Sequence, residues 1–188
     1  MRSLKLCVML FFTLCFVYAP NFCSAGLMDN PRVAVFPIAS QIANKSIVID
    51  DGAYTEIRTM VDYDLRSFSS FDMLERPDID KVLTEQEFSH TAVVDPSTAA
   101  KLGKILGAEY IVLGAVTGLA RVDGEYAGRV TLRMVEVETA RIVLTGMGNS
   151  KSKTINDSLT GATEDALHGK RGMISMLEGK LPKVKRKR

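Results

Sequence analysis

The chain has 188 residues, of which 46% are apolar, and this suits one domain with a single hydrophobic core rather than several domains. The net charge of +2 hides an asymmetry, because six of the 24 Lys and Arg residues lie in Lys180–Arg188 and two more are Arg2 and Lys5. The rest of the chain carries 16 basic residues against 22 acidic ones, a net charge of −6. The sequence therefore combines an acidic body with a basic tail, which excludes a uniformly neutral surface.

Residues 1–25 have the pattern of a cleaved signal peptide. Arg2 and Lys5 precede an apolar run from Leu6 to Tyr18, and the small residues Ser24 and Ala25 follow. The run has about 13 residues, whereas a membrane-spanning helix needs about 20. We expect export and cleavage before Gly26.

All three cysteines, Cys7, Cys15 and Cys23, lie in this segment, so the mature chain is expected to contain no thiol and no disulfide. A lipid anchor at Cys23 is not expected, because the bulky Phe22 stands where lipoprotein signals have a small residue.

The first half of the mature chain alternates strands and helices. Arg32–Pro37 is a short apolar run that predicts a buried strand, and Gln41–Gly52 is expected to be mainly a loop, with Ile47–Ile49 as a candidate edge strand. Apolar residues at helical spacing predict a helix over Tyr54–Phe68. Phe71–Leu74 reads as a second strand, and Pro77 suits the first turn of the helix that follows.

The next helix has clear signals at both ends. Asp95 can cap it, Pro96 takes its first position, and Gly107 can end it in a left-handed conformation. The residues expected to face inward are Ala99, Leu102, Ile105 and Leu106. Tyr110–Val116 is apolar on both faces, so it is expected to be the central strand of the sheet.

The last part of the chain predicts two strands and a long helix. Val130, Leu132 and Met134 alternate with polar residues, a turn near residues 138–140 leads into Ile142–Leu144, and the helix is expected over residues 156–179 with Gly169 and Gly172 as weak points. The order β-α-β-α-α-β-β-β-α predicts a single α/β (α+β) domain over residues 26–180, a mixed β-sheet with helices packed on it.

Two stretches of sequence carry a resemblance to a known family. Residues 74–86 read LERPDIDKVLTEQ, and residues 95–117 read DPSTAAKLGKILGAEYIVLGAVT. Both resemble the motifs of the curli production assembly/transport component family, the CsgG-like domain. The resemblance implies the element order above and a scaffold or assembly factor without shared chemistry. The residues that match the motifs, and that we expect to be structural, are Glu75, Arg76, Asp95, Pro96, Gly107 and Gly114.

Sites for catalysis, metals or cofactors are not expected. Neither His90 nor His168 has a second ligand at metal-binding spacing, and no serine lies in a G-x-S-x-G turn. Asp62 and Asp64 are expected on the solvated side of their helix. The stretch Gly146–Ser152 lacks the glycine before lysine that a phosphate loop requires, so its glycines predict a flexible strand exit. The protein is therefore not expected to be an enzyme or to hold a cofactor.

The basic tail is the candidate interaction site. Its charged residues are Lys183, Lys185, Arg186, Lys187 and Arg188. Behind a signal peptide the available anions are phospholipid headgroups, lipopolysaccharide and acidic cell-wall polymers, not nucleic acid. The alternative, a solubilising end without a partner, stays open.

The resemblance also implies a location and a kind of function. The family's curli channel extends two strand hairpins from this domain, each needing 20 or more residues. The corresponding connections, Gly118–Gly128 and Gly146–Ile155, have only about ten residues each, so pore-forming hairpins are not expected. We therefore expect an exported periplasmic or envelope protein that acts by protein–protein interaction in envelope assembly or secretion, with self-association left open. The alternative is an accessory activator of a cell-wall (peptidoglycan) synthase, because outer-membrane activators of that kind share this fold.

Overall fold

A computed structural model describes residues 30–43, 47–68, 70–86 and 95–180, with the side chains of residues 178–180 left out. The strands are β1 (Arg32–Val35), β2 (Ala39–Ser40), β3 (Asp72–Met73), β4 (Tyr110–Val122), β5 (Glu125–Glu136) and β6 (Arg141–Ser152). The helices are α2 (Asp51–Arg66), α3 (Arg76–Glu85), α4 (Pro96–Leu106), α5 (Ile155–His168) and α6 (Met173–Lys180).

The strands form one six-stranded mixed sheet, which confirms the predicted fold class. Its order is β3-β1-β4-β5-β6, with β2 paired to the middle of β4 at Ala115 and Val116. The strands β1 and β2 run parallel to β4, and β3 runs parallel to β1, whereas β5 and β6 are antiparallel neighbours. The strand β4 is central, as its apolar sequence predicts.

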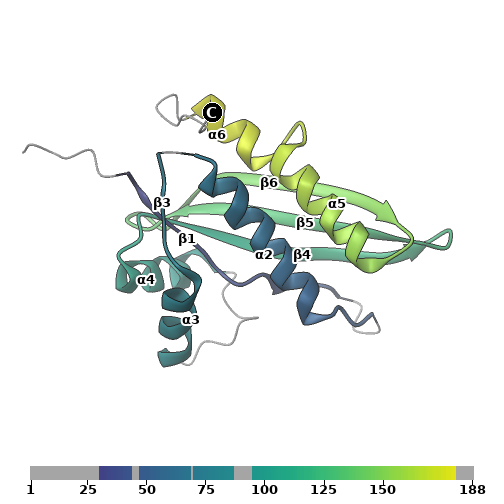
Figure 1. The fold of residues 1–188 in the computed structure, drawn as a ribbon, viewed down its shortest axis with the longest axis horizontal. Helices are drawn as coiled ribbons and strands as arrows, with labels where there is room; N and C mark the ends of the chain where they lie inside the picture. The colour runs from purple at the N-terminus through teal and green to yellow at the C-terminus, as the bar shows by residue number, and fades with distance from the viewer. Residues whose placement is uncertain (1–29, 44–46, 69, 87–94, 181–188) are drawn as a thin grey trace, which may run out of the picture.

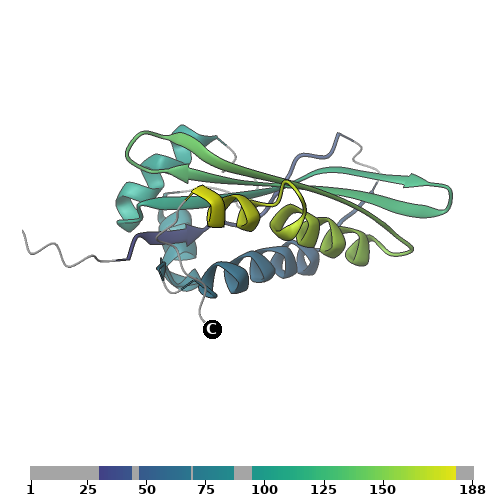
Figure 2. The same cartoon turned by 90° about the horizontal axis from the view of Figure 1, so that it is seen from above.

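Helices cover the two faces of the sheet to different extents. The helices α2, α5 and α6 lie on one face along most of its length, whereas α3 and α4 lie on the opposite face near one end only (Figures 1 and 2). On that second face, no helix of the described chain lies over the half that leads to the β4–β5 turn (Figure 2). The sheet therefore has one covered face and one half-covered face.

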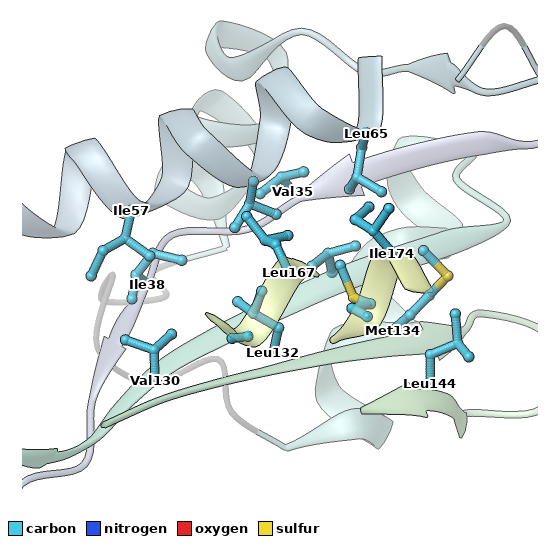
Figure 3. Close-up of a cluster of buried hydrophobic side chains, with 14 of the residues drawn as sticks. Val35, Ile38, Ile57, Leu65, Val130, Leu132, Met134, Leu144, Leu167 and Ile174 are labelled. Atoms are coloured by element: carbon cyan, nitrogen blue, oxygen red, sulfur yellow. The ribbon is translucent and has the colours of Figure 1, made fainter. Parts of the chain in front are cut away.

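Each covered region has its own hydrophobic core. The core beneath α2, α5 and α6 includes Val35, Leu65, Leu132, Leu167 and Ile174, whose side chains converge in Figure 3. The smaller core beneath α3 and α4 is built around these residues: Phe36, Ile79, Leu83, Leu102, Ile111 and Leu113. Because side chains alternate along a strand, Ile111 and Val112 point into different cores. The expectation of a single core is therefore wrong.

Two glycines of β6 let α5 lie close against the sheet. A β carbon at Gly148 would collide with the backbone of Ala162 and Ala166, and one at Gly146 would collide with Ala166 and Met173. Both glycines are buried. The prediction of a flexible strand exit at this stretch is wrong, because these residues are paired with β5.

The three long strands are longer than the sequence indicated. The strand β4 continues to Val122 and β5 begins at Glu125, so residues 118–128 form a hairpin around Asp123 and Gly124, both of which have positive φ. Residues 146–152 likewise continue β6. The predicted connections are thus mostly part of the six-stranded sheet itself.

Three further expectations need correction. Residues 47–49 are not a strand, and Val48 is 82% exposed. Ile105 is not inward-facing but 57% exposed, because the buried side of α4 is formed by Ala99, Leu102 and Gly103. The expected last helix is two helices, since the chain turns tightly at residues 169–172, where a β carbon on Gly172 would collide with Leu167.

Candidate functional site

The residues that match the family motif around α4 have structural roles. Asp95 accepts a hydrogen bond from the Thr98 amide at 2.8 Å, Pro96 is the first residue of the helix, and Gly107 ends it with φ of 65°. These observations confirm the predicted cap and helix end. Gly114 lies in the middle of β4, where a β carbon would collide with the side chain of Ile38.

Glu75 contacts α2 rather than its motif neighbour Arg76. Glu75 is exposed at the start of α3, and its Oε1 lies 3.4 Å from Nη1 of Arg66 on α2. Arg66 also donates to Asp62 Oδ2 at 2.8 Å, and this hydrogen bond is the main reason that the pKa of Arg66 is raised. Arg66 therefore connects Glu75, at the start of α3, to α2.

Asp62 and Asp64 are not on a solvated surface, contrary to expectation. Their side chains are 12% and 17% exposed. Asp64 Oδ2 lies 2.7 Å from Nε2 of His168, the last residue of α5. This contact joins α2 to α5, although the two residues are far apart in sequence.

The basic tail, Lys183 to Arg188, lies outside the described residues, as does His90. Their assigned roles stay predictions. The candidate site described next lies on the folded domain.

The uncovered half of the second face is the main candidate. It is formed by alternate residues of β4, β5 and β6 that point away from α5, and we call it the open face: Thr117, Ala120, Ala127, Arg129, Thr131, Arg133, Thr145, Met147, Asn149 and Lys151. Their neighbours in the strands, such as Val130, Leu144 and Gly148, are buried beneath the helices. The open face follows from this two-residue period.

The open face is basic. It carries Arg129, Arg133 and Lys151, and the acidic residue in the same alternation is Glu125, the first residue of β5, at its edge beside the turn. Arg129 Nε donates to Asn149 Oδ1 at 2.8 Å, which holds its guanidinium across the β5–β6 pair. The hydroxyls of Thr117 and Thr131 lie 3.2 Å apart across β4 and β5. Thr117 occupies an irregularity where the β4–β5 register shifts.

A depression of about 530 Å³ lies at the distal end of the open face. It is lined by small residues of β4 and β5, among them Gly118, Ala120 and Ala127, and also by Arg129 and Lys151. Because these small residues have no bulky side chains, another chain can approach the strands closely there. The arrangement suits a docking surface.

The sequence indicated only part of this surface. The alternation of Arg129, Thr131 and Arg133 with apolar residues predicted one solvated face of β5. The matching row on β6 was missed because Gly146 and Gly148 occupy the buried positions where apolar side chains are expected. Had glycine been counted as a buried residue, Leu144 to Lys151 would have shown the same period.

No group of three His, Cys, Asp or Glu residues in the described ranges could hold a metal ion. Within the same ranges, no helix is both long and apolar enough to cross a membrane.

Comparisons with known proteins bear on the family and the fold. The lipoprotein GNA1162 from Neisseria meningitidis has the same fold, with 14% identity, a TM-score of 0.52, and coverage of 80% of this chain and 98% of that one. The LpoB C-terminal domain from Escherichia coli aligns with 16% identity and a TM-score of 0.48, covering 68% of this chain and 87% of that one. The PelC dodecamer from Paraburkholderia phytofirmans aligns with 16% identity and a TM-score of 0.45, covering 77% and 91%.

A comparison with curated proteins found no significant match. The model of the family "Curli production assembly/transport component CsgG" matches residues 27–128, more than half of the chain. This match confirms the resemblance seen in residues 74–86 and 95–117. The chain belongs to the CsgG family of curli production assembly/transport components.

Proposed function

We propose that the protein is exported to the cell envelope and acts there by binding another protein through the open face, in envelope assembly or secretion and without catalysing a reaction. The open face is the observation that carries this proposal, because it is a solvent-exposed region of sheet with a depression and an excess of positive charge. Family membership supports the role in assembly or transport. The basic and apolar segments of residues 1–18 support export.

The expected occupant is an acidic segment of a partner protein. Arg129, Arg133 and Lys151 lie on one face and outnumber Glu125 at its edge, so an acidic chain is attracted and a basic one repelled. Arginine is enriched at protein interfaces, and the small residues of the depression allow close approach of a chain. The partner therefore complements the surface in both charge and shape.

Site-specific crosslinking in the native host tests the proposal. A photo-crosslinking residue at Met147 should trap a discrete partner, whereas one at Thr59, exposed on α2, should not. In the Met147 background, Lys151→Glu should reduce the crosslink, and Lys101→Glu, an exposed lysine of α4, should leave it unchanged. Equal trapping at Met147 and Thr59, or a crosslink that Lys151→Glu does not weaken, would contradict the proposal.

The identity of the trapped protein separates the two roles. A curli-like subunit or another secretion component supports assembly or secretion. A peptidoglycan synthase supports the alternative role as an accessory activator.

A further inference from the structure

The outer edge of β6 is long for an edge strand. The strand has 12 residues and lies at the end of the sheet order, with β5 on one side and no strand of the described chain on the other (Figure 1). An edge strand presents unpaired N–H and C=O groups, and proteins commonly protect such edges by keeping them short. Since most strands have about 5–6 residues, β6 is a long template for an added strand.

One hydrogen bond identifies the backbone groups that point outward from β6. The amide of Asn149 donates to Oδ2 of Asp165 on α5 at 3.0 Å, so this amide points away from β5. In an antiparallel pair, the direction of the backbone groups repeats every second residue. The β5–β6 register is continuous over residues 144–152, so the amides and carbonyls of Thr145 and Met147 also point outward. Asp165 thus closes the edge at Asn149 and leaves it open at Thr145 and Met147.

The side chains along this edge are partly apolar. Met147 is 48% exposed and belongs to the open face. Ile142 is 44% exposed and is paired with Val135 of the smaller core, so it points to the same side of the sheet as the open face. Exposed apolar side chains on an edge strand favour pairing with another strand. Lys151, which is exposed, adds a positive charge to the same row.

The charge of the row decides between possible occupants of the edge. Pairing with β6 of a second copy would place the basic residues of two open faces side by side, and like charges repel. A segment of another protein avoids this when it carries an apolar residue opposite Met147 and an acidic residue two to four positions further along. Opposite and diagonal neighbours on adjacent strands are within reach, so that acidic side chain lies beside Lys151.

We infer that the partner binds as an added strand. An extended acidic segment pairs its backbone with Thr145 and Met147 at the outer edge of β6, with an apolar side chain against Met147 and a carboxylate beside Lys151. Main-chain hydrogen bonds supply affinity in binding of this kind, and alternate side chains supply specificity. The inference rests on the proposed function and adds the way in which the partner is held.

A proline at the edge tests the inference. A photo-crosslinking residue at Thr131, which lies on β5 directly opposite Met147, reports whether the open face is occupied in the native host. Met147→Pro removes an N–H that points away from β5, so the hydrogen bonds between β5 and β6 stay. This variant should reduce the crosslink several-fold. Met147→Ala, the matched control, keeps the N–H and loses only side-chain contacts, so it should reduce the crosslink less.

Hydrogen exchange gives a second measurement that does not depend on the proline variant folding. In the purified crosslinked complex, the amides of Thr145 and Met147 should exchange several-fold more slowly than in the free protein. The amide of Asn149 should change less, because it is already bound to Asp165.

The outcomes separate the inference from the proposed function. A crosslink that persists in Met147→Pro at an unchanged thermal midpoint, or unchanged exchange of the Thr145 and Met147 amides, would overturn the inference and leave the proposed function standing. Absence of any crosslink at Thr131 in the otherwise unaltered protein would contradict the proposed function, and the inference with it.

Discussion

Asp95 links a local sequence signal to a pH-dependent contribution to stability. The hydrogen bond from the Ser97 hydroxyl, and next that from the Thr98 amide, lower the pKa of Asp95 from 3.8 to about 2. A pKa that is lower in the folded state adds stability above the ordinary pKa, and this stability is lost as the pH falls through about 2. Asp95→Ala should therefore lower the thermal midpoint at neutral pH, and its difference from the wild type should shrink between pH 4 and pH 2.

The control for Asp95 is Asp95→Asn, because asparagine also caps helices but carries no charge. Its midpoint should lie above that of the alanine variant at neutral pH. An alanine variant whose deficit stays constant from pH 7 to pH 2 would contradict the assignment of the charged cap.

Gly148 shows how one missing side chain sets the distance between a helix and a strand. Gly148→Ala places a methyl group against the backbone of Ala162 and Ala166, and overpacking of this kind costs about 1–3 kcal/mol or more. Gly118→Ala is the matched control, since its β carbon would lie 3.4 Å from Cβ of Arg129, an ordinary contact. Its effect on the free energy of unfolding should stay within about 0.5 kcal/mol. Similar denaturation midpoints for both variants would disprove the close approach of α5.

Features that depend on neighbouring residues, such as helix caps, could be predicted from the sequence, but contacts between residues far apart in the chain could not. The cap at Asp95 and the left-handed Gly107 depend on their immediate neighbours. Asp64 looked solvated because its partner, His168, is brought beside it only by the packing of α5 against α2. For the same reason, the sequence did not indicate the ion pair between Arg58 on α2 and Asp80 on α3.

At the scale of elements, the two sides of α4 differ sharply in burial. Leu102 is 2% exposed and packs in the core with Ile111, whereas Ile105 is more than half exposed. Leu102→Ala should lower the free energy of unfolding by about 2–5 kcal/mol, as buried leucines do. Ile105→Ala should change it by less than about 0.5 kcal/mol. Chemical denaturation measures both, and equal losses would mean that Leu102 does not lie on the buried side of α4.

Element boundaries were harder to predict than element types. The ends of β4 and β6 contain Gly118, Gly146 and Gly148, which suggest loops when read locally. Within the sheet, each glycine is instead paired with a residue of β5. The end of the last helix was misplaced for another reason: apolar residues resume at helical spacing at Met173 and Ile174, although the chain turns at residues 169–172, where the Gly172 amide donates to the carbonyl of Gly169.

The two ends of the molecule differ because the three antiparallel strands are much longer than the other strands of the sheet. Three strands of 12 or 13 residues extend well beyond the short parallel strands, and α3 and α4 cover only the end near β1 and β3 (Figure 2). The family motifs span α3, α4 and the first part of β4, so the sequence predicted the compact end of the fold best. The open face lies at the other end, where the motif signal stops.

The basic tail is expected to attract anionic surfaces independently of the folded domain. Outside residues 180–188 and the two front residues, the chain carries a net charge of −6, so the positive charges of Lys183 to Arg188 should dominate contact with anionic vesicles. Deleting these six residues should leave the thermal midpoint unchanged, because they follow Pro182 and include only one apolar residue, Val184. The deletion should weaken vesicle binding, and wild-type binding should fade as salt shortens the Debye length from about 10 Å at 0.1 M to about 3 Å at 1 M.

The control is the double variant Arg129→Ser with Lys151→Ser, which removes two charges from the open face and should reduce vesicle binding less than the deletion does. If binding survives both the deletion and high salt, the tail only solubilises the protein.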